Sequence, residues 1–293
     1  MWRQLQPSQT ARLCTYDIVS GEKRVVREIS DAVLEAPNWT PDGKYLVYNQ
    51  EGLLYRINPD GGEPELIDTG AVRDSNNDHM LSPDGNFLYV SSGDGHLYEI
   101  PLSGGQARKV SNDHAEPFRY FLHGISPDGR TLAYTGAQER DGNAFGQLDI
   151  FTIPVAGGED TRVTSHAKPD DGAEFSPDGA WIYFNSELAS TTPGHAQVFR
   201  MRPDGSEITQ LTDDERVNWF PHVSPNGAEL VYLSYPPGVT GHPADKDVIL
   251  RRMSPEGGPS EDLLHFHGGQ GTINVNSWAP DSRRFGYVEY PIA

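Results

Sequence analysis

Three histidines and one glutamate occupy matching places along the chain. His79 and His123 lie three residues before the first position of a recurring Ser-Pro-Asp-Gly tetrapeptide, and Glu174 and His222 lie two residues before it. Imidazole and carboxylate groups bind divalent metal ions and also transfer protons near neutral pH. We therefore expect the four side chains to converge.

Three interpretations of this set stay open. The first is a site for a divalent metal ion, Mn, Zn or Ca, held by His79, His123, Glu174 and His222. The second is a metal-free site in which His123, Glu174 and His222 are catalytic acids and bases. The third is a set of hydrogen-bonded channel residues without a ligand.

Further polar and aromatic residues fall in the long segments between apolar runs. A guanidinium group can bind a carboxylate, an indole ring can stack on a sugar ring, and amide or phenol groups can bond to hydroxyls. On this basis the residues predicted to bind a substrate are Arg119, Tyr120, Arg216, Trp219, His267 and Gln270.

The tetrapeptide is the repeat that must position these side chains. It occurs at residues 40–43, 82–85, 126–129, 176–179 and 224–227, and in a degenerate form at residues 279–282. Its prolines follow one another at steps of 42, 44, 50, 48 and 55 residues, in or near the range of propeller blades. Proline presets φ, Asp or Asn bonds locally and Gly accepts a positive φ, so each copy predicts a turn between antiparallel strands.

Each turn is followed by an apolar strand and then by a second hairpin, as at residues 45–48 and 54–57. Four strands per repeat predict an all-β fold, a six-bladed β-propeller. The sixth turn precedes only one strand, residues 285–288, whereas residues 13–18 and 25–29 form a strand pair without such a turn. We therefore expect the N-terminal strands to complete the last blade, so that residues 1–293 form a single domain.

The predicted meander separates two ends of the ring. The Pro-Asp-Gly and Gly-Gly turns lie at one end, and the long loops and blade-to-blade links lie at the other. All 10 histidines fall at the long-loop end. Long loops on a rigid scaffold often carry binding groups, although they also collect polar residues without a function. The sequence favours a functional site at this mouth of the central channel.

Charge and cysteine content limit the partners and the compartment. The net charge of −19 repels nucleic acid and anionic membrane surfaces, so neither is expected as a partner. The single cysteine, Cys14, allows no disulfide within the chain. The first residues lack the apolar core of a signal peptide, so we expect a cytoplasmic protein, or a periplasmic one if a leader has been removed.

The repeats carry a resemblance to a known family. With Trp39 before the first turn and Trp278 before the last, the chain resembles the TolB propeller and, more broadly, the WD-like repeats. The resemblance implies the fold over almost the whole chain. Oligogalacturonate lyases, which hold a divalent metal with histidines and a glutamine on a similar propeller, are a more distant likeness through His265, His267 and Gln270. Their ring is seven-bladed and their residue order differs.

Two functions follow as hypotheses. One is an enzyme, a carbohydrate-active lyase or hydrolase with or without a metal, which binds a small polar or carbohydrate-derived ligand in the channel mouth. The other is a TolB-like module that binds a protein partner without catalysis. The enzyme predicts a deep polar pocket, and the binding module predicts a broad apolar patch. The many histidines favour the enzyme.

Overall fold

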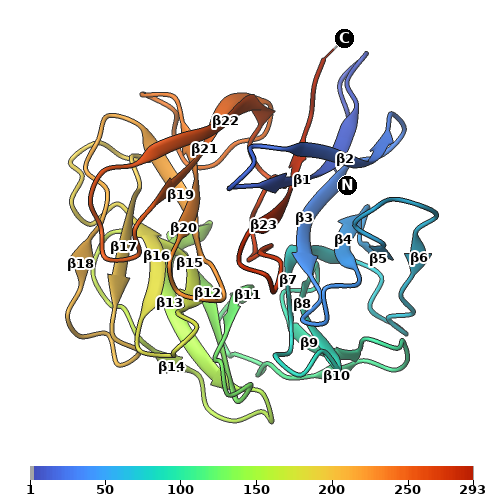
Figure 1. Ribbon diagram of the computed structural model, residues 1–293. Coiled ribbons are helices and arrows are strands. Elements are labelled where there is room, and N and C mark those ends of the chain that lie inside the picture. Colours follow the sequence, from blue (N-terminus) through green and yellow to red (C-terminus); the bar gives the residue numbers. More distant parts are fainter. Residues whose placement is uncertain (1–2, 293) are drawn as a thin grey trace.

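The computed structural model describes residues 3–292, which form 23 strands and no helix (Figure 1). No helix in this part of the chain could therefore span a membrane. Five antiparallel sheets have four strands each, and the sixth has three strands and an irregular innermost segment. These sheets form the six blades of a propeller ring, which confirms the fold expected from the repeat.

Each blade runs from its innermost to its outermost strand. Blade 1 contains β3 (Leu34–Trp39), β4 (Leu46–Gln50), β5 (Leu53–Ile57) and β6 (Glu65–Leu66). Blade 2 contains β7 (Ser75–Leu81), β8 (Phe87–Ser92), β9 (Leu97–Pro101) and β10 (Arg108–Lys109). Blade 3 contains β11 (Phe118–Ile125), β12 (Thr131–Arg140), β13 (Asn143–Pro154) and β14 (Thr161–Arg162).

The second half of the chain continues this order. Blade 4 contains β15 (Asp170–Phe175), β16 (Ile182–Ser186), β17 (Gln197–Met201) and β18 (Thr209–Gln210). Blade 5 contains β19 (Val217–Val223), β20 (Leu230–Tyr235), β21 (Lys246–Met253) and β22 (Glu261–Gly268). Blade 6 contains β23 (Arg284–Glu289), β1 (Ala11–Asp17) and β2 (Lys23–Ile29).

The recurring tetrapeptide forms the turn between the first two strands of a blade. In blade 2 the Ser82 hydroxyl donates to Asp84 Oδ1 at 2.6 Å and accepts from the amide of Phe87 at 2.9 Å. Gly85 has a φ of 71°, which glycine adopts without the steric cost of a Cβ. The degenerate sixth copy adopts the same backbone, because Ser282 takes a φ of 57°. The turn is therefore a structural device.

The two ends of the chain share blade 6. β1 pairs with β23 from Arg12 opposite Glu289 to Asp17 opposite Arg284, and β2 pairs with the other edge of β1. Figure 1 shows the blue β1 beside the red β23. The innermost segment is held by a bridge between Trp278 and Phe285. The ring closes as the sequence predicted.

The apolar core lies between neighbouring blades. One buried cluster joins Leu233 of β20 to Tyr287 of β23, and another joins Leu13 of β1 to Leu46 of β4. The strands β16 and β20 are buried along their whole length. A sheet packed between two others buries both faces, so its strands read as continuous apolar runs rather than alternating ones.

The innermost strands of blades 1 to 5 (β3, β7, β11, β15 and β19) lose their regular pairing near the long-loop end. The irregularities fall between Glu35 and Asn38, Ser75 and His79, Leu122 and Gly124, Asp171 and Glu174, and Trp219 and His222. In three of these bulges one residue has a positive φ: Ala36 at 50°, Gly172 at 70° and Phe220 at 55°. A bulge bends the strand and re-aims its side chains. These irregular segments build the channel mouth.

Candidate functional site

A cavity of about 410 Å³ opens at the channel mouth among the long loops. Segments of blades 2 to 6 contribute to its wall. Its polar lining residues are Asn76, Asn77, Asp78, His123, Thr135, Asp171, His242, Gln270 and Asn274, and its apolar ones are Phe121, Phe145, Leu148 and Phe220. Convergent polar groups in a partly apolar cavity are typical of small-ligand sites.

His123 and Asp171 form a buried ion pair in this wall. His123 Nε2 lies 3.0 Å from Asp171 Oδ1, and His123 Nδ1 faces the backbone oxygen of Asn274 at 3.3 Å. Burial alone would lower the pKa of His123, but the charges of Asp78 and Asp171 and the bond to Asp171 raise it to about 9. Since both ring nitrogens face acceptors, the ring is an imidazolium at neutral pH.

Asp171 is held as a carboxylate by several donors. The Thr135 hydroxyl donates to Oδ1 at 2.6 Å, and the amide of Gly172 donates to the same oxygen at 2.8 Å. Burial would raise the pKa of Asp171, but the His123 cation outweighs it and the pKa falls to about 2. Asp171 and His123 therefore compensate each other's charge.

Asp78 is a second buried carboxyl group, with a different environment. Within residues 3–292, the Asn76 amide supplies its side-chain hydrogen bond, from Nδ2 to Oδ2 at 2.9 Å. Burial and the Asp171 charge raise the pKa of Asp78 to about 6, although the His123 cation opposes this shift. A carboxyl group with such a pKa can hold or release a proton near neutral pH, as general acids and bases must.

His242 and Gln270 form a further part of the cavity wall, where His242 Nε2 lies 3.8 Å from Asp171 Oδ2. His242 Nδ1 donates to Gln270 Oε1 at 2.5 Å, and Asn274 Nδ2 donates to the same oxygen at 3.1 Å. Burial lowers the pKa of His242, against the raising effect of the Asp171 charge. Burial outweighs the Asp171 charge and the bond to Gln270, which both raise the pKa, so His242 is neutral where His123 is charged.

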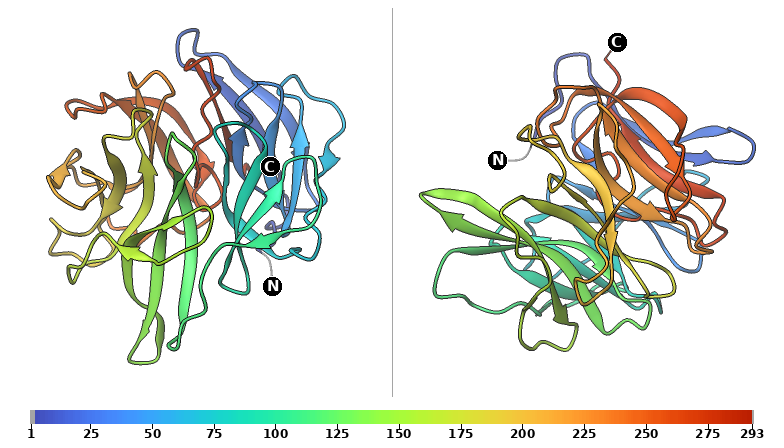
Figure 2. Two further views of the ribbon diagram at one scale, coloured as in Figure 1. Left: turned by 90° about the horizontal axis from the view of Figure 1, so that it is seen from below. Right: turned by 90° about the vertical axis from the view of Figure 1, so that its left-hand side faces the viewer.

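Aromatic rings enclose these polar groups. The ring centre of Phe220 lies 5.1 Å from that of His242 and 5.9 Å from that of His123. The ring centres of Phe121 and Phe145 lie 5.9 Å apart. Phe145 lies near the start of β13, close to the tip of the long β12–β13 hairpin. Figure 2 shows this green to yellow-green hairpin projecting from the ring. Phe220 holds a positive φ that costs about 1 to 3 kcal/mol in a residue other than glycine. Such strain is often found at binding sites.

The structure divides the four residues expected to converge. Glu174 and His222 form a separate buried pair, with 2.5 Å between Oε2 and Nδ1, and His222 Nε2 donates to the Ile273 oxygen at 2.7 Å. Glu174 Oε1 also accepts the amide of Val223 in the next blade at 3.0 Å. These bonds join blades 4, 5 and 6, and neither side chain lines the mouth cavity. The pair acts as an interblade clamp.

His79 is fully buried and lines no cavity wall. Neither of its ring nitrogens has a hydrogen-bond partner within the described chain, and burial lowers the pKa of His79 to about 4. It is an uncharged ring inside blade 2. Of the four expected residues, only His123 reaches the cavity.

The six residues expected to bind a substrate are also divided. Gln270 lines the cavity, and the Trp219 ring packs behind it against His242 with ring centres 4.3 Å apart. The other four side chains form hydrogen bonds outside the mouth cavity or are exposed to solvent. Tyr120 donates to Asp160 at 2.9 Å, Arg216 donates to Ser234 Oγ at 2.9 Å, His267 bonds to Asp247 at 3.0 Å, and Arg119 is exposed. No arginine therefore reaches the cavity wall.

The donor groups do not fit the expected metal ion. Among residues 3–292 no group of three or more His, Cys, Asp or Glu side chains is arranged to hold one. A histidine ligand must offer a ring lone pair, but both nitrogens of His123 and of His222 face oxygen acceptors. The four-residue metal site is therefore not assembled, because the strand bulges direct these side chains to different partners.

The acid sensitivity of His79 can be measured. The folded protein keeps His79 neutral down to a pKa of about 4, whereas an unfolded histidine binds a proton at about 6.5. Stability should therefore fall as the pH drops from about 6.5 toward 4. Replacing His79 with Leu removes this effect, and we expect the variant to gain about 2 kcal/mol relative to wild type between pH 8 and pH 5.

Denaturant unfolding of both proteins at the two pH values measures this gain. The control is His265→Leu, which also removes one imidazole but at a side chain that is 68% exposed. An identical pH dependence in wild type and His79→Leu would show that the buried ring is protonated in the folded protein.

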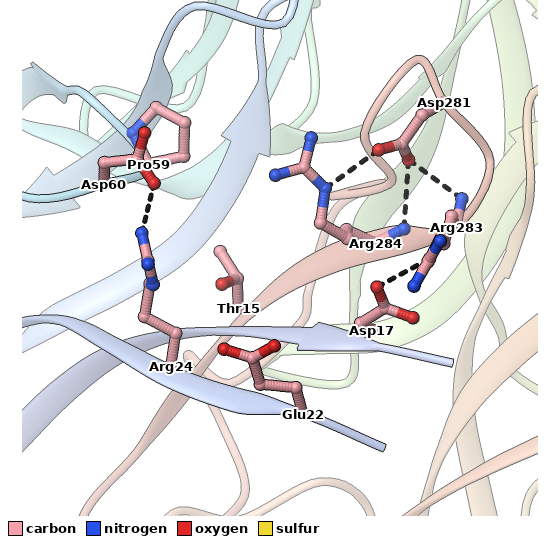
Figure 3. A pocket seen from close by; sticks show the side chains of 9 residues that line it. All are labelled: Thr15, Asp17, Glu22, Arg24, Pro59, Asp60, Asp281, Arg283 and Arg284. Carbon is pink, nitrogen blue, oxygen red and sulfur yellow. Dashed lines mark hydrogen bonds and ion pairs between the residues drawn. The ribbon is translucent and has the colours of Figure 1, made fainter. Parts of the chain in front are cut away.

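A second cavity, of about 390 Å³, lies where the β1–β2 hairpin, the turn after β5 and the start of β23 meet (Figure 3). Its arginines all have acidic partners: Arg24 pairs with Asp60, Arg283 with Asp17 at 2.6 Å, and Arg284 with Asp281 at 2.8 Å. Ion pairs between exposed side chains are screened by solvent and contribute little to the stability of the fold. This cavity leaves no cationic group free for a ligand, so the mouth cavity is the stronger candidate.

The ring and its mouth cavity define the class of protein: a six-bladed β-propeller with a cavity of mixed polar and aromatic lining at one end of its channel. The TolB beta propeller domain family matches residues 125–247. A protein of Agrobacterium fabrum, the uncharacterised Atu1656, is 40% identical over 280 residues, which cover 94% of this chain and 90% of that protein. The chain belongs to the family of TolB-like β-propellers.

Solved structures agree with this assignment. A TolB-like protein from Agrobacterium tumefaciens is 39% identical, with a TM-score of 0.88 over 98% of this chain and 100% of that one. An oligogalacturonate lyase in complex with manganese is 16% identical, with a TM-score of 0.57 over 90% of this chain and 75% of that one. The second likeness shows the fold alone.

Sequence reasoning missed Asp78, Asp171, His242 and the phenylalanines of the wall. Counting back from the turn assumes a regular strand, whereas each inner strand has a bulge between the turn and the mouth. Asp78 precedes the expected His79 directly and Asp171 lies three residues before the expected Glu174, so acidic residues close to the expected positions were the available signal. His242 lies in a long loop whose path depends on tertiary packing.

Proposed function

We propose that the mouth cavity binds a small, polar, carbohydrate-derived ligand. The observation that supports this most is the composition of the wall, in which amides, carboxyl groups and imidazoles stand beside phenylalanine rings. Hydroxyl groups of a sugar both donate and accept hydrogen bonds, and the apolar face of a sugar ring packs against aromatic side chains. A volume of about 410 Å³ suits a ligand of one or two sugar rings.

The same groups suit proton transfer in a lyase or hydrolase. Asp78 has a pKa of about 6 and lines the cavity, so it is the proposed acid or base. His123 keeps both ring protons bound to Asp171 and Asn274, so its proposed role is to supply positive charge and to position Asp171. No step of this proposal uses a metal ion, since the residues present do not fit one.

Gln270→Ala and Asn77→Ala test the proposed site. Each removes a polar group of the wall, and loss of one hydrogen bond to a neutral partner costs about 0.5 to 1.5 kcal/mol. We expect each variant to bind a sugar ligand about 3- to 10-fold more weakly, by saturation-transfer NMR or calorimetry. Lys44→Ala, in the first turn at the opposite end of the ring, is the control and should bind normally.

The protein-binding alternative makes the opposite prediction. A TolB-like module that grips a partner over a broad surface should tolerate the loss of one amide inside the cavity. Sugar binding that is absent from the wild type, or equal in all the variants, would therefore argue for that alternative or for a different small ligand.

A further inference from the structure

The charges around the mouth cavity do not cancel. None of the lining residues is Lys or Arg, and the single cation of the wall, His123, already pairs with Asp171 at 3.0 Å. Asp78 feels the His123 cation but forms no ion pair of its own, and it receives a side-chain hydrogen bond only from the neutral Asn76, within the part of the chain that the structure describes. The wall therefore carries a net negative charge once Asp78 is ionised.

Groups behind the wall do not reverse this balance. Glu35 is buried behind the wall. Burial raises the pKa of Glu35 to about 7, the Arg3 cation opposes this shift, and the Asp78 charge adds a smaller rise. The Arg3 guanidinium lies behind Gln270, where it is paired with Asp245 at 2.7 Å and donates to the Gln270 backbone oxygen at 3.1 Å. His242 bonds to an amide oxygen and adds no charge.

A cation would compensate the unpaired carboxylate. A carboxylate bound to an ammonium group makes a charge-assisted hydrogen bond, roughly twice as strong as a neutral one. The faces of Phe121, Phe145 and Phe220 carry negative partial charge and also attract cations. The net charge of −19 over the whole chain favours the approach of cations over anions.

We propose that the ligand of the mouth cavity is a sugar that carries a protonated amino group, with the ammonium bound by Asp78 and the ring packed against the phenylalanines. This inference rests on the proposed function and narrows its substrate class. It also disfavours sugar acids in the mouth cavity, because Arg119 and Arg216, which were expected to bind a carboxylate, lie outside its wall.

Three monosaccharides that differ mainly in charge test this inference on the wild-type protein. Glucosamine, glucose and glucuronate are titrated at pH 7 and low salt, with affinity measured by NMR or calorimetry. We expect glucosamine to bind about 10-fold or more tightly than glucose, from a charge-assisted bond in place of a neutral one, and glucuronate to bind most weakly. The advantage of glucosamine should shrink as salt is added.

The Asp78→Asn variant locates the charge that is responsible. It keeps the shape of the side chain and removes its charge, so within this variant glucosamine should bind no more tightly than glucose. Asp113→Asn is the matched control, because that carboxyl group lies at the same end of the ring but is 84% exposed and lines no cavity wall. It should keep the full preference for glucosamine.

Each outcome decides between the two proposals. Equal binding of all three sugars, or tighter binding of glucuronate, would overturn the ammonium inference and leave the sugar site standing. A preference for glucosamine that survives in Asp78→Asn would also overturn it, because the charge would then act from elsewhere. Binding of none of the three sugars would overturn the proposed function and this inference together.

Discussion

A chain without residues 11–29 should fail to unfold cooperatively. The deletion removes β1 and β2, which are the third and fourth strands of blade 6. It exposes the edge of β23 and removes the fully buried side chains of Ala11, Leu13 and Cys14. An unpaired strand edge is a template for aggregation, and a propeller avoids it by closing the ring.

The expected loss is the whole stability of the ring. Each blade packs on two neighbours, so opening blade 6 weakens its contacts with blades 5 and 1 at once, and a domain has only about 5 to 15 kcal/mol of net stability. Calorimetry should show no cooperative transition in the truncated chain, or the chain should be recovered only as aggregate.

A deletion elsewhere serves as the control. Removing residues 139–146 and joining the ends with a two-residue Asn-Gly turn shortens the β12–β13 hairpin, whose tip is exposed and belongs to no interblade core. This variant should melt within a few degrees of wild type. If the chain without residues 11–29 melted as the hairpin control does, the two ends of the chain would not close the ring.

The second large effect is expected from Asp171→Ala. It leaves the His123 imidazolium buried without its partner, with only 3% of that residue exposed. Breaking a buried ion pair by removing one side costs about 3 to 5 kcal/mol. Denaturant unfolding at pH 6 should show this loss. In the double variant His123→Leu/Asp171→Leu, which has no buried charge to pair, most of the lost stability should return.

The pH dependence of this pair has a defined sign. The pKa of His123 is raised to about 9, so its contribution is complete below an ordinary pKa of about 6.5 and is lost as the pH rises through 9. The pKa of Asp171 is lowered to about 2, so its contribution is complete above about 4 and is lost as the pH falls through 2. Wild type should gain most from the pair between pH 4 and 6.5.

Between pH 6.5 and 9 the free energy of unfolding of the wild type should fall by about 3 kcal/mol, because the contribution of His123 is lost. The double variant should not show this fall. The result that contradicts the ion pair is a wild-type protein whose stability rises over this range, or a single Asp171→Ala variant as stable as the double one.

The propeller itself could be predicted from sequence because its determinants are local. Pro83, Asp84 and Gly85 act on the backbone of their own turn, and the spacing of six such turns leaves room for four strands in each interval. The closure of blade 6 could be predicted by counting strands, because the C-terminal repeat was two strands short and the N-terminal end had two strands without a turn of their own. Neither step required knowledge of a distant contact.

The candidate site was predicted only as a location. His123 and Gln270 were identified as site residues and they do line the cavity, whereas Glu174, His222 and His79 have other partners. Their positions relative to the turn were read as equivalent. A regular strand would have made them so, but one bulge reverses which side of the strand a residue faces.

Sequence alone determined the number of blades, the way the ring closes and the end at which the polar groups gather, because turn chemistry and strand length are properties of short segments. Only the tertiary structure decided that Asp171 pairs with His123, that Asp78 forms no ion pair of its own and that no arginine reaches the wall. Those facts depend on the bulges of inner strands that belong to different blades. Where such side chains point is determined by the packing between blades and not by the residues of any one strand.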